Sequence, residues 1–402
     1  MFRHFERAAA NYHKWSAKLS PGNQNPKKKI LFVVNEDWFF YSHRLALAEA
    51  CKRDGWEVAV TARISNHGEA IRKAGISVFP SSMQRGRISF ASLWGEFKTI
   101  LELRRLIRRE RPTVLHLIGL KPVVFGAFAA NLRRPPLTVN ALTGMGYIFT
   151  SAQWDIRIIR EAIKFALRFA LKRKRTSLIV QNRGDAEDLI SAGVVRSGQV
   201  SVIMGSGVNI EKFRACPEPE GPVVAAFVGR MLRDKGIYEL VKAARELKAR
   251  KTDLKILLVG NPDPGNPTSI PEDTLEGWSR EGLLKWVGYR NDIAELWRST
   301  HIAVLPSYRE GMPLSLLEAS ATGRPLVTTD VPGCREIAEH GFNGFVVPQQ
   351  DWRNLANAIE ELVVSPEIRK VMGDAARQKV ESVYDEKTVI LQTMKIYEQA
   401  FA

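Results

Sequence analysis

Two carboxylates flank a glycine–proline turn, a pattern suited to holding hydroxyl groups beside an anion. Glu310 precedes the turn and Glu318 follows it, and each can accept hydrogen bonds from sugar or ribose hydroxyls. We expect a helix to begin at Pro313 and to end at Gly323, so that free backbone N–H groups at its start can bind an anion. The alternative is two ordinary surface acids. The turn consists of Glu310, Gly311, Met312, Pro313 and Leu314.

A second element places two cations between glycines. Arg230 and Lys235 lie between Gly229 and Gly236, after one apolar run and before a helical pattern. The glycines permit a tight turn with close backbone approach. A guanidinium fork beside an ammonium group suits a diphosphate. The alternative is a strand-to-helix loop with solvated charges.

The elements that position these two turns are predicted from short apolar runs that alternate with helical patterns. Such alternation predicts parallel β-α-β units with helices on both faces of a sheet. It occurs twice, on either side of the Gly- and Pro-rich segment 205–222, which we interpret as an interdomain linker. The sequence therefore predicts an α/β protein of two doubly wound, Rossmann-like parallel-sheet domains that face a ligand cleft. The expected strands are 30–34, 57–61, 114–118, 137–142, 178–181, 223–228, 255–259, 284–287, 302–305 and 326–329.

The two turns together resemble the signature pair of glycosyltransferase family 4, whose members have the GT-B architecture. The resemblance runs from about residue 29 to about residue 384 and includes 205–209 and 288–292. Within the family, the chain is most similar to bacterial enzymes that extend polyprenyl-diphosphate-linked oligosaccharides, including those that transfer N-acetylgalactosamine. The resemblance implies a retaining transfer of a hexose or N-acetylhexosamine from a nucleotide diphosphate sugar, which we expect to be UDP-linked.

The resemblance also implies roles for matched positions. Arg230 and Lys235 would neutralise the leaving diphosphate, where negative charge develops. Glu310 would contact sugar hydroxyls near the reacting carbon, Glu318 would hold the ribose, and Tyr289 would contact the nucleobase. The implied donor site consists of Gly229, Arg230, Lys235, Tyr289, Glu310, Gly311, Met312, Pro313, Leu314 and Glu318.

The phosphate charge in this arrangement is met by basic side chains and amides. The sequence contains no Asp-x-Asp motif, and we expect neither an essential metal nor a cofactor. Inverting chemistry would instead need a carboxylate base on the acceptor side, and Glu36 and Asp37 remain candidates for that role.

The first half of the chain supplies candidates for the acceptor side. His116 resembles the family histidine that touches the donor sugar, and we count it as catalytic with Glu310, Arg230 and Lys235; the alternative is a structural histidine. The loop 35–44 lacks the Gly-Gly turn of many family members, and its aromatic residues could line an acceptor groove or pack in the core. The acceptor candidates are His43, Arg44, Lys121, Gly144 and Gly146.

The net charge of +16 is concentrated in one half of the molecule. Residues 1–200 contain 34 basic and 15 acidic residues, whereas the remainder contains 25 and 28. Within 155–175, basic residues recur every three or four positions beside apolar ones, which predicts an amphipathic helix on an anionic membrane surface. A solvated basic surface is the alternative. Residues 1–28 form an extension that we expect to be either a further anchor or disordered.

Three isolated cysteines and the lack of a long apolar run predict a cytoplasmic protein, peripheral on the inner face of the membrane. The expected domains are 29–204 for the acceptor and 223–384 for the donor, with a helix in 385–402 packing back on the first. Two alternatives remain within the same architecture, a transferase that acts on a soluble acceptor and a nucleotide-sugar epimerase. A nucleic-acid-binding protein would explain the charge but not the two acids, and we expect no nucleic-acid partner.

Overall fold

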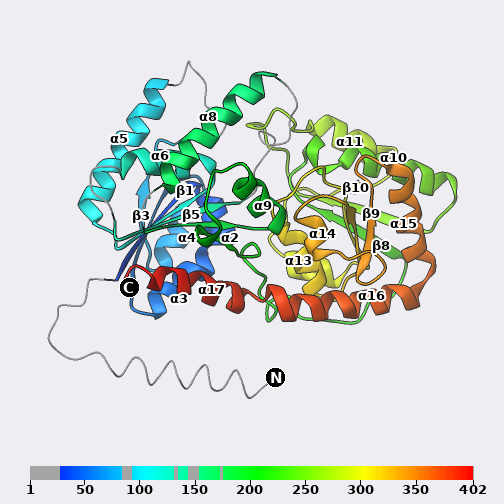
Figure 1. Cartoon of the computed structure of the whole chain (residues 1–402). Coiled ribbons are helices and arrows are strands. Elements are labelled where there is room, and N and C mark those ends of the chain that lie inside the picture. The colour runs from blue at the N-terminus through cyan, green and yellow to red at the C-terminus, as the bar shows by residue number, and fades with distance from the viewer. Residues whose placement is uncertain (1–27, 84–92, 131–134, 144–153, 173–174, 402) are drawn as a thin grey trace.

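A computed structural model describes residues 28–83, 93–130, 135–143, 154–172 and 175–401. It contains two α/β domains, each built on a parallel sheet with helices on both faces (Figure 1). This confirms the predicted pair of doubly wound domains. The first sheet has seven strands in the order β3-β2-β1-β4-β5-β6-β7, and the second has six in the order β10-β9-β8-β11-β12-β13.

The strands form where the sequence is apolar almost without interruption. Every residue of β4, β11 and β12 is buried, as expected when helices cover both sheet faces. Sequence analysis missed β3, β7 and β13, which are short edge strands. The first-domain strands are β1 (Lys29–Glu36), β2 (Glu57–Arg63), β3 (Ser77–Pro80), β4 (Val114–Ile118), β5 (Leu137–Leu142), β6 (Thr176–Val180) and β7 (Val200–Val202). The second-domain strands are β8 (Val223–Val228), β9 (Leu254–Val259), β10 (Lys285–Trp286), β11 (Ile302–Leu305), β12 (Leu326–Thr329) and β13 (Gly344–Val347).

The helices complete the layers on each side of the sheets (Figure 1). Those of the first domain are α2 (Asp37–His43), α3 (Leu45–Arg53), α4 (Gly68–Lys73), α5 (Leu93–Glu110), α6 (Leu120–Ala129), α8 (Trp154–Leu171) and α9 (Arg183–Ser191). Those that follow are α10 (Ile237–Ala249), α11 (Glu272–Arg280), α12 (Ile293–Arg298), α13 (Leu314–Ala321), α14 (Cys334–Ile337), α15 (Trp352–Val364), α16 (Pro366–Lys379) and α17 (Glu386–Glu398).

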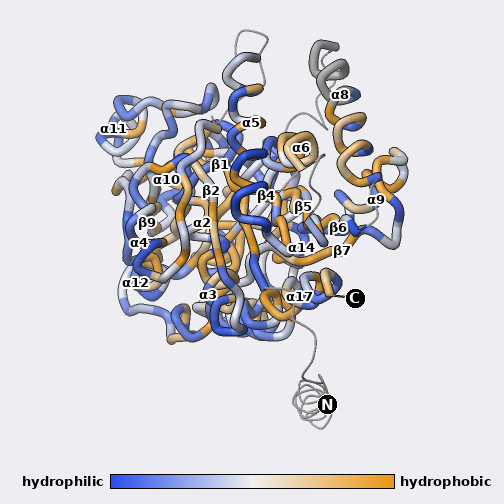
Figure 2. The backbone as a smooth tube through the Cα atoms, turned by 90° about the vertical axis from the view of Figure 1, so that its left-hand side faces the viewer, coloured by the Kyte–Doolittle hydropathy of each residue, from blue (hydrophilic) through white to orange (hydrophobic). Residues whose placement is uncertain are grey.

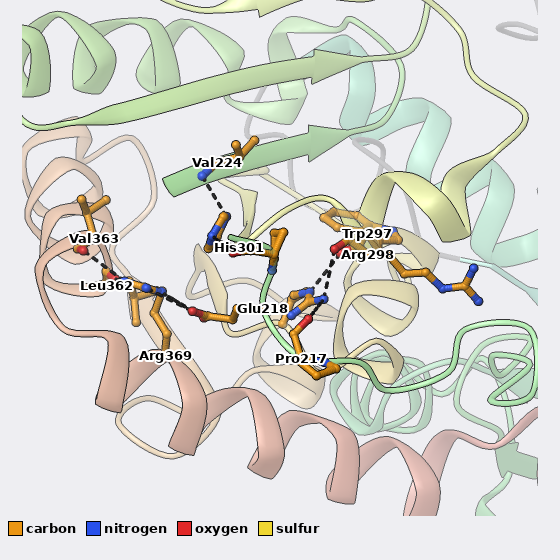
Figure 3. Close-up of polar contacts among 11 residues, drawn as sticks. Pro217, Glu218, Val224, Trp297, Arg298, His301, Leu362, Val363 and Arg369 are labelled. Atoms are coloured by element: carbon orange, nitrogen blue, oxygen red, sulfur yellow. Dashed lines mark hydrogen bonds and ion pairs between the residues drawn. The ribbon is translucent and has the colours of Figure 1, made fainter. Parts of the chain in front are cut away.

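The later part of the linker is fixed to the second domain. Figure 3 shows Arg369 pointing at Glu218, whose carboxylate accepts from Nε at 2.9 Å and from Nη2 at 3.0 Å. Arg324 donates to the carbonyl of Pro217 at 3.0 Å. His301 accepts from the N–H of Val224 at 3.1 Å, at the start of β8. Val208 and Phe213 also belong to the second-domain core, so the start of the linker, before Val208, is the segment that joins the domains.

The chain passes between the two domains a second time, beside that segment. The N–H of Val208 donates to the carbonyl of Tyr384 at 2.9 Å, and the N–H of Glu386 donates to the carbonyl of Val208 at 3.0 Å. Gly207 has a φ of 70°, and a Cβ there would lie 2.6 Å from the Cα of Glu386, so the two crossings touch directly. After this contact the chain returns to the first domain, where α17 packs against α3 (Figure 1).

Helices α5 and α8 rise from the same side of the first domain, with α6 packed between them (Figures 1 and 2). The buried face of α8 includes Ile163 and Leu167 in the domain core. Some large apolar side chains on these helices remain in solvent, namely Trp94 at 87%, Phe97 at 54% and Phe165 at 70% exposure.

Candidate active site

The loop after β11 brings Glu310 against the cationic turn after β8. The carboxylate of Glu310 accepts from Lys235 Nζ at 2.5 Å and from Ser307 Oγ at 2.6 Å. The two loops pack so closely that a Cβ on Gly236 would lie 1.9 Å from the carbonyl oxygen of Pro306. Gly236 also has a φ of 70°, which favours glycine. The structure therefore joins the two predicted turns in one site.

Arg230, the second cation, is also paired with an acid. Its Nη1 donates to Asp263 Oδ2 at 2.6 Å, and the backbone N–H of Asp263 donates to Ser269 Oγ at 2.8 Å. Asp263 was missed by sequence analysis because it lies in the loop after β9, outside both turns. Both phosphate candidates are thus held by carboxylates, which orient the cations toward one edge of the sheet.

The predicted helix start lies on the other side of Glu310. α13 begins at Leu314, with Pro313 as its N-cap residue and Gly323 just beyond its end. Among the described residues, the N–H groups of Gly311 and Met312 have no hydrogen-bond acceptor, so they are available to a ligand.

Glu318 and Tyr289, the expected nucleoside contacts, lie in α13 and in the loop after β10. Glu318 is half-buried one turn into α13, and burial raises its pKa from the ordinary 4.5 to about 7, against the opposing attraction of Lys212. Tyr289 follows Gly288 in the loop after β10 and is 63% exposed. An exposed ring on a loop is free to stack on a base.

His116 does not face the cleft as we expected. It lies in the middle of β4, only 1% exposed, and its Nδ1 is 2.6 Å from the hydroxyl of Tyr397 on α17. Burial and the nearby charge of Arg44 lower its pKa well below the ordinary value, so the ring is neutral. Its position in the core therefore gives no support to direct contact of His116 with a donor sugar.

The expected acceptor residues are dispersed rather than gathered on one rim. Lys121 is only 8% exposed, and its Nζ pairs with Glu96 on α5 at 2.7 Å. This buried ion pair fixes α5 to α6, so Lys121 is not a free cation for a diphosphate. Gly144 and Gly146 lie outside the described residues.

His43 and Arg44 point toward the crossing segments instead of the sheet edge. His43 stacks on Phe39, with ring centroids 4.5 Å apart, and burial followed by the charge of Arg44 lowers its pKa to about 4. Arg44 is buried, and burial lowers its pKa to about 10. Both side chains line a small hollow with Ser206 and Glu386. This location contradicts a role on an open acceptor surface.

The two candidate bases for inverting chemistry are committed to structural contacts. The carboxylate of Glu36 is 3.2 Å from Arg63 Nε, and the residue is 3% exposed. Asp37 is fully buried; burial alone would raise its pKa, but hydrogen bonds from Ser65 and His67 hold it below the ordinary value. Both carboxylates therefore make contacts within the first domain.

The first domain meets the Glu310 loop directly at Gly311. A Cβ on Gly311 would lie 2.5 Å from the carbonyl oxygen of Thr143 and 2.5 Å from Gln181 Oε1. Gln181 was not among the sequence candidates, because a lone glutamine after a strand carries no recognisable motif. Its position beside Gly311 became evident only from the contact between domains.

Known protein families match both halves of the chain. Residues 29–182 match the family described as Glycosyl transferase 4-like, and residues 208–379 match the Glycosyl transferases group 1 family. The segment between the two matches, 183–207, includes α9, β7 and the start of the linker. Each match therefore centres on one of the two sheets.

Curated relatives extend over most of the chain. An N,N'-diacetylbacillosaminyl-diphospho-undecaprenol alpha-1,3-N-acetylgalactosaminyltransferase of Campylobacter jejuni is 25% identical over 386 residues, 92% of this chain and 98% of the relative. A UDP-Gal:alpha-D-GlcNAc-diphosphoundecaprenol alpha-1,3-galactosyltransferase of Escherichia coli is 26% identical over 72% of this chain and 76% of its own.

A solved structure supports the fold. HepE of Anabaena, in complex with UDP and glucose, superposes with a TM-score of 0.71 at 20% identity, covering 92% of this chain and 98% of that one. With the two parallel sheets and the two joined turns, these similarities show that the chain belongs to family 4 of the glycosyltransferases, retaining enzymes with the GT-B fold.

Proposed function

We propose that this enzyme transfers a hexose or N-acetylhexosamine from a UDP-sugar to a polyprenyl-diphosphate-linked saccharide. The observation that carries the proposal is the contact of Glu310 with Lys235, because it joins a sugar-binding acid to a phosphate-binding cation. The relatives in Campylobacter jejuni and Escherichia coli act on lipid-linked diphosphates, which supports the acceptor class. The UDP bound to HepE supports the nucleotide.

The geometry suggests how the leaving group is stabilised. The bond between the anomeric carbon and the β-phosphate oxygen breaks, and the acceptor oxygen bonds to the same face of that carbon. The acceptor proton passes to the departing phosphate oxygen, so no protein base is required. Lys235 and Arg230 meet the charge that develops on the diphosphate. For this, the phosphate must compete with Glu310 and Asp263 for the two cations.

The raised pKa of Glu318 predicts a pH-dependent donor affinity. A carboxylate can accept hydrogen bonds from both ribose hydroxyls, whereas the protonated acid has lost part of that capacity. Because the folded pKa is about 7, the ionised fraction falls as the pH drops below 7. We expect the Kd for UDP to rise about tenfold between pH 8 and pH 6.

Titration calorimetry of UDP across this pH range measures the effect. Glu318→Gln should bind UDP weakly and with little pH dependence. The unfolding free energy should show the opposite trend, because a raised carboxyl pKa favours the protonated folded state, so this group's contribution is lost as the pH rises from 4.5 to 7. A flat Kd profile in the unmodified enzyme would contradict the assignment of Glu318 to the ribose.

We also expect turnover to survive chelation by EDTA. The two cations and the N–H groups at Gly311 and Met312 supply the positive charge that a divalent ion would otherwise provide. The rate measured with EDTA should lie within about twofold of the untreated rate. A loss of activity that added magnesium or manganese restores would overturn this expectation.

The proposed membrane surface consists of α5 and α8. The exposed aromatic side chains Trp94, Phe97 and Phe165 lie on these helices, and Arg105 and Arg108 on α5 are exposed as well. Apolar and cationic side chains together are typical of a surface that binds anionic lipid. None of the described helices is long and apolar enough to cross a bilayer.

In the structure, some of the basic side chains of 155–175 that we expected to face anionic lipid instead make contacts within the protein. Arg168 donates to the carbonyl of Ala192 at 2.7 Å and to that of Gly193 at 3.2 Å, so it caps the end of α9. Lys164 pairs with Glu161 at 2.8 Å. The uniform basic face that we expected is therefore interrupted, and the apolar side chains become the stronger part of the proposal.

The location follows from the same proposal. The protein would lie on the inner face of the cell membrane, where its soluble donor and lipid-linked acceptor meet. Cys51, Cys216 and Cys334 are free thiols, which suits a reducing compartment.

A donor panel tests the proposed function. The panel contains UDP-N-acetylgalactosamine, UDP-N-acetylglucosamine, UDP-galactose and UDP-glucose, each with a polyprenyl-diphosphate saccharide in anionic vesicles. We expect one donor to be turned over with retention of anomeric configuration, as read by NMR of the product. Turnover of free saccharides at the same kcat/KM as the lipid-linked acceptor would favour the soluble-acceptor alternative. Interconversion of UDP-sugars without transfer would favour the epimerase.

A further inference from the structure

Gln181 has a largely buried side chain whose amide the fold itself does not use. It is the first residue after β6, at the carboxyl end of the strand, and only 7% of its surface is exposed. Among the described residues its side chain has no hydrogen-bond partner. Because the described protein makes no hydrogen bond to this amide, both of its ends are available to a ligand at the site it faces.

The neighbouring residue shows what a structural amide does here. Asn182 caps α9: its Oδ1 accepts from the N–H of Asp185 at 2.7 Å, and its Nδ2 donates to the carboxylate of Asp185 at 3.1 Å. Asn182 thus uses both ends of its amide within the protein. The helix cap is complete without Gln181, so capping does not explain why a polar side chain occupies that buried position.

The amide of Gln181 is directed at the donor loop. Its Oε1 lies 2.5 Å from the position a Cβ on Gly311 would take, and the carbonyl of Thr143 lies at the same distance. Gly311 follows Glu310, whose carboxylate is bonded to Lys235. The first domain therefore presents a free carboxamide beside the acid and the cation that define the donor site.

We propose that Gln181 binds a hydroxyl or acetamido group of the transferred sugar. A carboxamide is uncharged and both donates and accepts hydrogen bonds, which matches these groups and gives it no strong preference for the diphosphate. The inference rests on the proposed donor function and deepens it. The sugar is then held from both domains, with Glu310 on one side and Gln181 on the other, so Gln181 contributes to sugar selection.

The test compares two glutamine-to-methionine variants. Methionine has nearly the same volume and no amide. Gln181→Met should leave the Kd for UDP unchanged, raise the Kd for the UDP-sugar about tenfold, and lower kcat/KM at least as much. Its Tm should equal or exceed that of the unmodified enzyme, because no hydrogen bond within the protein is lost. Binding is measured by titration calorimetry and Tm by scanning calorimetry.

Gln199→Met is the matched control, since the amide of Gln199 donates to the carbonyl of Leu171 at 3.0 Å, away from the donor loop. It should lower Tm and leave the Kd values for UDP and UDP-sugar unchanged. A Gln181→Met enzyme that keeps the ratio of the two Kd values, or loses affinity for both ligands equally, overturns the inference. If the unmodified enzyme binds no UDP, the proposed function fails instead, so the two failures are distinguishable.

Discussion

Alanine in place of Lys235 or Arg230 is expected to lower kcat at least 100-fold. Groups that stabilise developing charge in a transition state commonly contribute about 3 kcal/mol, and both cations lie at the predicted diphosphate position. The effect should appear in kcat and in the Kd for UDP, measured on purified enzyme with the preferred donor. Because Lys235→Ala also removes one of the hydrogen bonds that Glu310 accepts, leaving the one from Ser307, Tm should be recorded in parallel.

The same loop supplies a control for this prediction. Arg233 is exposed, and its guanidinium lies 5.7 Å from the ring centroid of Tyr238. Arg233→Ala removes the same charge at a distance of two or three positions and should retain at least half of the activity. If Lys235→Ala and Arg230→Ala were as active as Arg233→Ala, the donor-site assignment would be wrong.

Removing three exposed aromatic side chains should release the enzyme from membranes. Trp94→Ala, Phe97→Ala and Phe165→Ala together are expected to weaken binding to anionic vesicles about 100-fold or more, since burying one large apolar side chain contributes about 1.5–3 kcal/mol. Vesicle co-sedimentation at fixed salt measures the effect. Turnover of a short water-soluble acceptor should change little, whereas turnover of the lipid-linked acceptor should fall.

An equally exposed set away from α5 and α8 provides the comparison. Val364, Val371 and Leu391 are 68%, 67% and 67% exposed on α15, α16 and α17. Alanine at these three positions should leave vesicle binding unchanged. If both triple variants sedimented with vesicles like the unmodified enzyme, α5 and α8 would not be the docking surface. Equal loss of turnover on both acceptors would instead indicate damage to the fold.

The placement of the two turns could be predicted because their determinants are local in sequence. A strand, a glycine turn and a helix start occupy consecutive positions, so Arg230, Lys235 and Glu310 were expected at one sheet edge. Their pairing could not be predicted in the same way. Lys235 and Glu310 come from loops about 75 positions apart, and Asp263 comes from a third loop.

The acceptor half was misjudged because sequence does not show which face of a strand is covered, or by what. In β4 the side chains alternate, with Leu115 and Leu117 on one face of the sheet and His116 on the other. That other face is covered by α17, almost three hundred positions later. Lys121 illustrates the same difficulty, since its burial depends on Glu96 in a separate helix.

The return of α17 to the first domain affects the order in which the two domains can fold during translation. Tyr397 and Ile396 belong to the core beneath the first sheet, yet the ribosome adds them roughly 195 residues after Val202 in β7. At about 5–20 residues per second, that face of the nascent domain stays uncovered for roughly 10–40 s. During synthesis the second domain can therefore complete its core first. The core of the first domain is completed last, when α17 has been added.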